Sequence, residues 1–210
     1  MTKEIDVSKL IDKMSFMELA EQSPEDVCRR AVCRYDHIDR CYTLSVWGEE
    51  YAIYPHELKI ESITSNFTRP HDYFYIFLVN YLLQANETKL CEEWISEKDI
   101  LGGSAFFRGP HEIPTNLISS RYSGNIEEFN KICQQLGGTP LNMADASYSF
   151  QITPRVLVAV LYWDGDEDFP PESKILYDKS IAGHIALDII FALAVDICSR
   201  IGRASLKMAN

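Results

Sequence analysis

The segment from residue 73 to residue 83 is apolar or aromatic on nearly every face that a helix would present to its surroundings. Thr68-Arg69-Pro70-His71-Asp72 provides a helix start, and Gln84-Ala85-Asn86 follows the last leucines. A helix without a polar face must be shielded from water on most sides. We therefore predict a central core helix here, with the rest of the chain packed around it.

The chain is long enough to bury such a helix. It has 210 residues, of which 46% are hydrophobic and 11% aromatic, and a chain of this length buries about 70% of its unfolded surface. We find no internal repeat, low-complexity tract or long linker. Residues 1–22 have weak helical spacing and are interpreted as an N-terminal arm, and residues 23–205 as a single domain.

Two further helices have start and stop signals. Ser23-Pro24-Glu25-Asp26 combines an N-cap, a first-turn proline and two carboxylates, which predicts a helix running to about Arg34. Asn125-Ile126-Glu127-Glu128 resembles a capping box, and Gly137-Gly138 closes an amphipathic stretch behind it.

Alternation of apolar and polar residues marks the strands. Residues 41–54 predict a hairpin, and residues 58–63 predict a third strand or an irregular edge segment. Residues 147–152, 156–161 and 174–177 predict three more strands, the second of them continuously apolar. The fold class expected is α+β: a single domain with a mostly antiparallel sheet packed against three or four helices.

The last helix, from Ile185 to about Ile201, is apolar over most of its surface. Its polar residues Asp188, Asp196, Ser199 and Arg203 fall within one sector of about 80°. The apolar remainder is expected either to be buried within the monomer or to form a subunit interface.

The net charge of −11, from 20 basic and 31 acidic residues, disfavours binding to nucleic acid or to an anionic membrane surface. The N-terminus lacks the apolar run of a signal peptide, and no apolar stretch is long enough to span a bilayer. We therefore expect a cytoplasmic protein. Its six cysteines match no zinc or iron–sulfur spacing, so no metal site is expected from them.

Familiar catalytic motifs are absent from the sequence. Gly102-Gly103-Ser104 is no nucleophile elbow, no phosphate loop or dinucleotide fingerprint is found, and His111-Glu112-Ile113-Pro114-Thr115 lacks the second histidine of a zincin. The densest ionisable cluster is Asp164-Gly165-Asp166-Glu167-Asp168, directly after an apolar strand. Asp164, Asp166 and Asp178 are candidate catalytic carboxylates if antiparallel strands bring Asp178 beside this turn, and a solvated acidic turn is the alternative.

A ligand pocket is the other possibility that the residues leave open. We expect it between the glycine-rich loop at residues 102–110, the acidic turn and the start of the last helix. The candidate cofactor-binding residues are His184, His111, Gly103, Phe106 and Phe169.

The C-terminal half carries a family resemblance. Residues 145–155, the acidic Phe-Pro turn at 164–170 and Lys174-Ile-Leu-Tyr-Asp178-Lys-Ser180 are similar to the "domain of unknown function 3786" family, as are Ser23 to Asp26 and Gly102 to Phe106. The match covers about residues 23 to 202, and Tyr177 stands where the family usually has phenylalanine. The resemblance implies a bacterial or archaeal cytoplasmic protein. Some members look like the rear half of proteins with a corrinoid-type iron–sulfur domain in front.

Three functional hypotheses follow from these observations. The first is a non-enzymatic ligand-binding or accessory protein, with a corrinoid or other tetrapyrrole of anaerobic one-carbon metabolism as the ligand that the resemblance implies. The second is a metal-dependent hydrolase or transferase using the acidic turn with Asp178 and His184. The third is an oligomeric scaffold. The partners expected are a small molecule, a second copy of the chain or a methyl-transfer protein.

Overall fold

The computed structural model describes residues 3–5, 10–64 and 70–205, and in this part the strands form two antiparallel sheets. The first sheet has the order β1-β5-β4-β3-β2. Its strands are β1 (Lys3–Ile5), β2 (Arg34–Asp36), β3 (Cys41–Val46), β4 (Glu49–Tyr54) and β5 (Lys59–Ser62). The predicted hairpin is the β3–β4 pair, in which Tyr42 lies opposite Ile53, and β5 is the predicted third strand.

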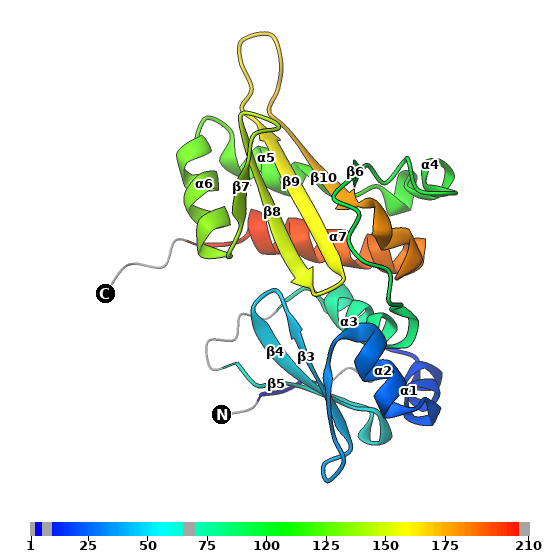
Figure 1. Cartoon of the computed structure of the whole chain (residues 1–210). Coiled ribbons are helices and arrows are strands. Elements are labelled where there is room, and N and C mark those ends of the chain that lie inside the picture. The colour runs from blue at the N-terminus through cyan, green and yellow to red at the C-terminus, as the bar shows by residue number, and fades with distance from the viewer. Residues whose placement is uncertain (1–2, 6–9, 65–69, 206–210) are drawn as a thin grey trace.

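The second sheet has the order β6-β10-β9-β8-β7. Its strands are β6 (Trp94–Ile95), β7 (Thr139–Leu141), β8 (Ala146–Thr153), β9 (Val156–Trp163) and β10 (Glu172–Asp178). The apolar β9 is its central strand, as expected for a strand buried on both faces. The two sheets lie one above the other in Figure 1.

Seven α-helices and three 3-10 turns complete the described part of the chain. The α-helices are α1 (Lys13–Glu21), α2 (Pro24–Ala31), α3 (Asp72–Gln84), α4 (Gly103–Phe106), α5 (Asn116–Tyr122), α6 (Ile126–Gln135) and α7 (Leu187–Gly202). The 3-10 turns are η1 (Pro55–Glu57), η2 (Gly109–His111) and η3 (Lys179–Gly183). Helix α2 ends before Arg34 because Val32 takes a left-handed conformation with φ of 55°.

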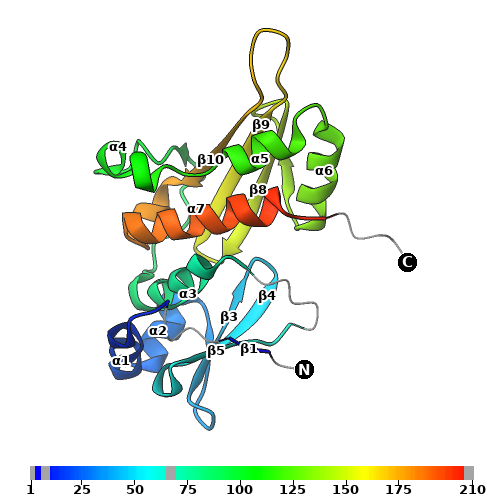
Figure 2. The same ribbon diagram turned by 180° about the vertical axis from the view of Figure 1, so that it is seen from behind.

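The packing of α3 against α7 joins the two halves. Figure 2 shows α7 and α5 along the back of the second sheet, while α3 lies beneath them against the first sheet. Seven buried residues of α3 and seven of the eleven buried residues of α7 belong to one continuous hydrophobic core. The α+β class, the single domain and the central position of α3 are therefore confirmed. The apolar face of α7 is covered by its own chain.

Part of the predicted N-terminal arm, residues 10–22, contributes side chains to this core. The Asp12 side chain caps α1 by accepting a hydrogen bond of 2.9 Å from the amide of Met14, a cap that the sequence analysis missed. Phe16 and Leu19 are buried, and β1 pairs with β5. Residues 1–2 and 6–9 of the predicted arm lie outside the described residues. No helix of the described chain is long and apolar enough to cross a membrane.

The packing of α1 can be tested with two substitutions on the same helix. Leu19→Ala removes a side chain with no exposed surface and should lower the free energy of unfolding by about 2–5 kcal/mol. Met17→Ala is the control, because Met17 is 52% exposed and should change it by about 0.5 kcal/mol or less. Equal urea midpoints for the two variants would show that α1 does not contribute to the core.

Candidate functional site

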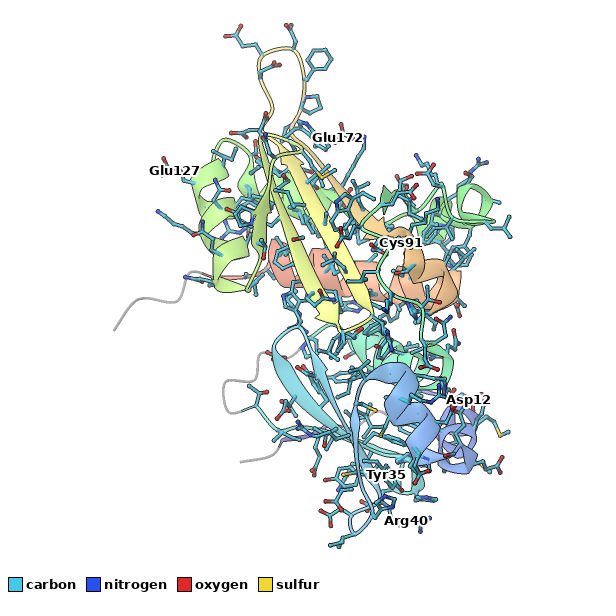
Figure 3. All side chains as sticks on the ribbon, in the orientation of Figure 1. Asp12, Tyr35, Arg40, Cys91, Glu127 and Glu172 are labelled. Carbon is cyan, nitrogen blue, oxygen red and sulfur yellow. The ribbon has the colours of Figure 1, made fainter. Side chains whose placement is uncertain are left out.

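The acidic turn and Asp178 lie at opposite ends of strand β10. Glu172 pairs with Trp163 next to the turn, whereas Asp178 pairs with Trp94 at the far end. Six residues of strand separate the two ends by about 20 Å. Figure 3 labels Glu172 at the base of the turn and Cys91, whose amide binds Asp178, near the other end. The expected carboxylate pair is therefore wrong: β9 and β10 are antiparallel neighbours joined by the acidic turn, and β10 ends at Asp178, away from that turn.

Hydrogen bonds occupy Asp164 and Asp166 within the turn itself. Asp164 accepts hydrogen bonds from the Gly124 amide at 2.8 Å and the Tyr162 hydroxyl at 2.7 Å. Asp166 accepts from the amides of Asp168 and Phe169 at 2.9 and 2.8 Å. These contacts hold the projecting hairpin in shape (Figure 1), with the Phe169 side chain 70% exposed near its tip.

Asp178 is a buried anchor for the chain that precedes β6. Its carboxylate accepts hydrogen bonds from the amides of Cys91 and Glu92, the latter at 2.7 Å, and from the amide and hydroxyl of Ser180. Burial alone would raise the pKa of Asp178, but these donors outweigh it and hold the pKa below its ordinary value. The carboxylate thus fastens a loop and caps η3.

His184 is buried beside that loop. Its Nδ1 accepts a hydrogen bond of 3.3 Å from the Asn86 amide, and its Nε2 is buried with no hydrogen-bond partner among the described residues. Burial, and then the charge of Arg155, lower its pKa, which favours the neutral imidazole.

Three of the five candidate cofactor-binding residues share one surface. His111 stacks on Phe106, with ring centroids 4.5 Å apart, and meets the edge of Phe191 from α7 at 5.4 Å. Gly103 supports this loop, because a Cβ there would lie 1.9 Å from the Glu97 carbonyl oxygen. Phe169 lies on the distant hairpin, so the expected pocket between the glycine-rich loop, the acidic turn and the last helix does not assemble.

A cavity of about 510 Å3 is found instead near the other end of α7. Four elements line it: the β3–β4 turn, the residues that start α3, the end of α6 and the C-terminal half of α7. The turn is positioned by Trp47, whose amide donates to the Ile152 carbonyl at 2.8 Å and whose indole Nε1 donates to the Leu136 carbonyl at 2.8 Å. The cavity thus lies where the two sheets meet.

Charged side chains are buried in the wall of this cavity. The Asp196 carboxylate accepts a hydrogen bond of 2.8 Å from the His71 amide and one of 3.2 Å from Nε of Arg200. Nη1 of Arg200 also lies 3.5 Å from Glu49, which accepts a hydrogen bond from the Tyr51 hydroxyl. Burial raises the pKa of Asp196, and Arg200 offsets only part of that effect.

Arg200 is the central group of this arrangement. Its side chain is 9% exposed and lies over the rings of Trp47 and Phe74, with centroids at 5.0 and 5.1 Å. Burial alone would lower the pKa of Arg200. The nearby Asp196, Tyr51 and Glu49 raise that pKa by more, so it lies above its ordinary value and the guanidinium stays charged. Its Nη2 is buried, and no described residue accepts a hydrogen bond from it.

The mouth of the cavity carries a second cation. Arg203 caps the end of α7, is exposed, and forms no ion pair with any carboxylate in the part of the chain that the structure describes. Ser199 and the His71 side chain line the same space. The polar groups are faced by apolar surface from Pro70, Ile132 and Leu136.

Comparison with family models gives one match, which covers residues 23–200 with the Domain of unknown function (DUF3786). The chain belongs to this DUF3786 family. No match was found among curated proteins or solved structures. Membership confirms the resemblance identified from the sequence. The matched range leaves out α1, which nevertheless packs into the same core as the DUF3786 segment.

Sequence reasoning missed the cavity, although one signal for it was present. Asp196, Ser199 and Arg203 belong to the polar sector noted on the last helix, and all three line the cavity. A polar stripe on a helix that is otherwise buried marks the side where its surroundings are polar or open. Arg200 lies outside that sector and gave no such signal. In the described chain, no group of three or more His, Cys, Asp or Glu residues could hold a metal ion.

The anchoring role of Asp178 makes a pH-dependent prediction. Asp178→Asn should lower the free energy of unfolding at pH 7 by about 2 kcal/mol, because charge-assisted hydrogen bonds are lost. Since the pKa of Asp178 in the folded protein lies below its ordinary value of 3.8, the stabilisation is present above that value and disappears as pH falls through the folded pKa. Urea unfolding between pH 7 and pH 2 should therefore show the difference from wild type shrinking with acid.

Glu93→Gln is the matched control for this prediction. Glu93 lies on the same loop, but its side chain is exposed and pairs only with Lys179 at 3.0 Å. Loss of this exposed charge pair should change the free energy of unfolding by about 0.5 kcal/mol or less. A pH-independent loss in Asp178→Asn would contradict a role for the carboxylate charge.

Proposed function

We propose that this protein is a non-enzymatic binding protein for a small organic anion with an apolar body, held in the cavity at the end of α7. The observation that carries the proposal is the pair of arginines in the cavity lining: Arg200 is buried in the wall, and Arg203 is exposed and forms no ion pair with a described carboxylate. An exposed guanidinium beside apolar surface can bind the carboxylate or phosphate of a ligand.

The size and lining of the cavity support this proposal. A volume of about 510 Å3 lies within the range of small-molecule sites, which combine apolar walls with a few polar groups. Pro70, Ile132 and Leu136 provide apolar surface, and Arg203 provides an exposed cation. A ligand carboxylate or phosphate at Arg203 would lie on the side of the cavity that also contains Arg200.

The polar contacts in the wall favour binding over proton transfer. Asp196 is held by Arg200 and the His71 amide, and Glu49 by Arg200 and Tyr51. The Nδ1 atom of His71 accepts a hydrogen bond from the Tyr73 amide at the start of α3. Groups engaged in this way form a fixed, charged wall, which is the preorganisation that ligand recognition requires.

Thermal unfolding with three small probes tests the proposal. Phenyl phosphate and benzoate should raise the melting temperature, and uncharged benzyl alcohol should not. A probe at 100 times its Kd adds about 2.7 kcal/mol of stability. Arg203→Gln should abolish the shift, because it removes the accessible cation while leaving the buried Arg200 contacts in place.

Arg108→Gln is the matched control, since Arg108 is also exposed but lies in the glycine-rich loop, away from the cavity lining. It should retain the shift seen in wild type. The absence of any shift with both anions, or an equal shift in Arg203→Gln and wild type, would overturn the proposal.

A corrinoid or other tetrapyrrole is the second candidate ligand, implied by the family resemblance. The observation that favours it is His111, an exposed imidazole whose ring is oriented by Phe106 and Phe191. Such a nitrogen can serve as an axial ligand to cobalt or iron. His184 and Phe169 do not contribute to that surface, so the macrocycle would be held by the loop at 102–111 and by α7.

Absorbance titration with cobalamin and with haem tests this second candidate. Binding through His111 should shift the visible bands, and His111→Ala should remove the shift. His56→Ala is the control, because His56 is also exposed but lies in η1 of the first sheet region. Unchanged spectra at a high concentration of each cofactor would exclude a tetrapyrrole as the ligand.

A further inference from the structure

Two cysteines lie side by side at the end of helix α2. The Sγ atoms of Cys28 and Cys33 are 3.8 Å apart, and both residues are half-buried. Cys28 is in the last two turns of the helix, and Cys33 is the second residue after it. They lie outside the lining of the cavity described above.

The helix end explains why the two thiols meet. Val32 has φ of 55°, and its amide and that of Cys33 both donate to the Cys28 carbonyl. This left-handed ending turns the chain back, so that the side chain after the cap contacts the side chain at the start of the last turn. A β-branched residue is unusual in that conformation. The backbone therefore fixes a contact that is normally apolar, and here it joins two thiols.

The surroundings of the pair govern its reactivity. Burial raises the pKa of both thiols, and the effect is larger for Cys33, where the nearby Cys28 adds to it. Both groups are therefore neutral thiols at pH 7, and they do not form the persistent thiolate of a nucleophilic enzyme. Cys28 is the less deeply buried of the two, so an external reagent reaches it first.

We propose that Cys28 and Cys33 form a reversible dithiol–disulfide pair that exchanges with small-molecule disulfides. In the first step the Cys28 sulfur attacks one sulfur of the external disulfide, whose S–S bond breaks and releases one thiol. In the second step the Cys33 sulfur attacks the mixed disulfide at Cys28 and releases the second thiol. The protein loses two protons and two electrons, and the external disulfide gains them as it becomes two thiols.

Formation of this bond requires little movement. The sulfur atoms must approach by about 1.8 Å to reach the bond length of about 2.0 Å, starting from 3.8 Å. Oxidation would fix the end of α2 to the beginning of β2. The end of α2 also contacts the rest of the molecule. The Arg30 side chain donates a hydrogen bond of 2.5 Å to the Ala85 carbonyl, and the Arg30 carbonyl accepts one of 3.3 Å from the Arg155 side chain.

The test equilibrates the native full-length protein with reduced and oxidised glutathione at several ratios, then alkylates free thiols with N-ethylmaleimide in mildly acidic denaturant, where exchange is slow because few thiols are ionised. Arg29 and Arg30 lie between the two cysteines, so trypsin leaves a Cys28–Cys33 disulfide as two linked peptides that separate on reduction. The expected result is that these linked peptides appear as the glutathione ratio becomes oxidising and vanish when it is reversed.

Matched variants make the result specific. Cys91→Ser removes the exposed cysteine, which is the main competitor for glutathione, and should leave the linked peptides unchanged. Cys33→Ser should instead accumulate a mixed disulfide of glutathione on Cys28. If both cysteines stay alkylated under conditions in which Cys91 of the wild type is fully glutathionylated, or if Cys28 pairs with another cysteine, the proposal is overturned.

Discussion

The packing of α3 against α7 is the constraint on which the rest of this structure depends. The two helices bury each other and belong to one hydrophobic core to which residues of both sheets also contribute. Because both helices are apolar over most of their surface, neither could be exposed without a large loss of hydrophobic stabilisation. The same contact sets the position of the start of α3, since the His71 amide donates a hydrogen bond to Asp196 on α7. The β3–β4 turn lines the cavity together with these two helices at that point.

Burying charge beside this junction is costly, and the structure offsets the cost only in part. Asp196 and Arg200 neutralise each other, and Trp47 and Phe74 contact the guanidinium. A buried ion pair is weak evidence for stability, because well-packed apolar residues would often serve the fold equally well. The fold therefore does not by itself require a charged pair at this position, and the proposed ligand would give Arg200 a role beyond folding.

Local signals in the sequence predicted the parts of the fold that local physics determines. The helix start before α6, the alternation in β3, β4 and β8, and the apolar run of β9 depend on neighbouring residues, and each element was found where expected. The division into two sheets depends on pairings between distant segments, which periodicity does not encode. The candidate carboxylate pair failed for a different reason. It was conditional on β9 and β10 being antiparallel neighbours, which they are, but the second strand of such a hairpin ends away from the connecting turn, so Asp178 lies a full strand away from Asp164. The polar sector of α7 pointed to the cavity, yet nothing in the sequence showed that the β3–β4 turn would face it.

The charge of the whole molecule constrains how such a cavity could select its ligand. With a net charge of −11, the protein repels anions at distances comparable to the Debye length, about 8–10 Å near physiological ionic strength. An anion would therefore be attracted only over a short range, where its attraction to Arg203 and to the dipoles of the wall exceeds the repulsion from the rest of the molecule. Added salt would weaken the distant repulsion and the contact with exposed Arg203 together, while the partly dehydrated side of the cavity near Arg200 is screened least. Selectivity at this site would then depend more on how the apolar body of the ligand fits against Pro70, Ile132 and Leu136 than on the charge of the ligand. A cavity with this mixed lining therefore suits an organic anion better than an inorganic one.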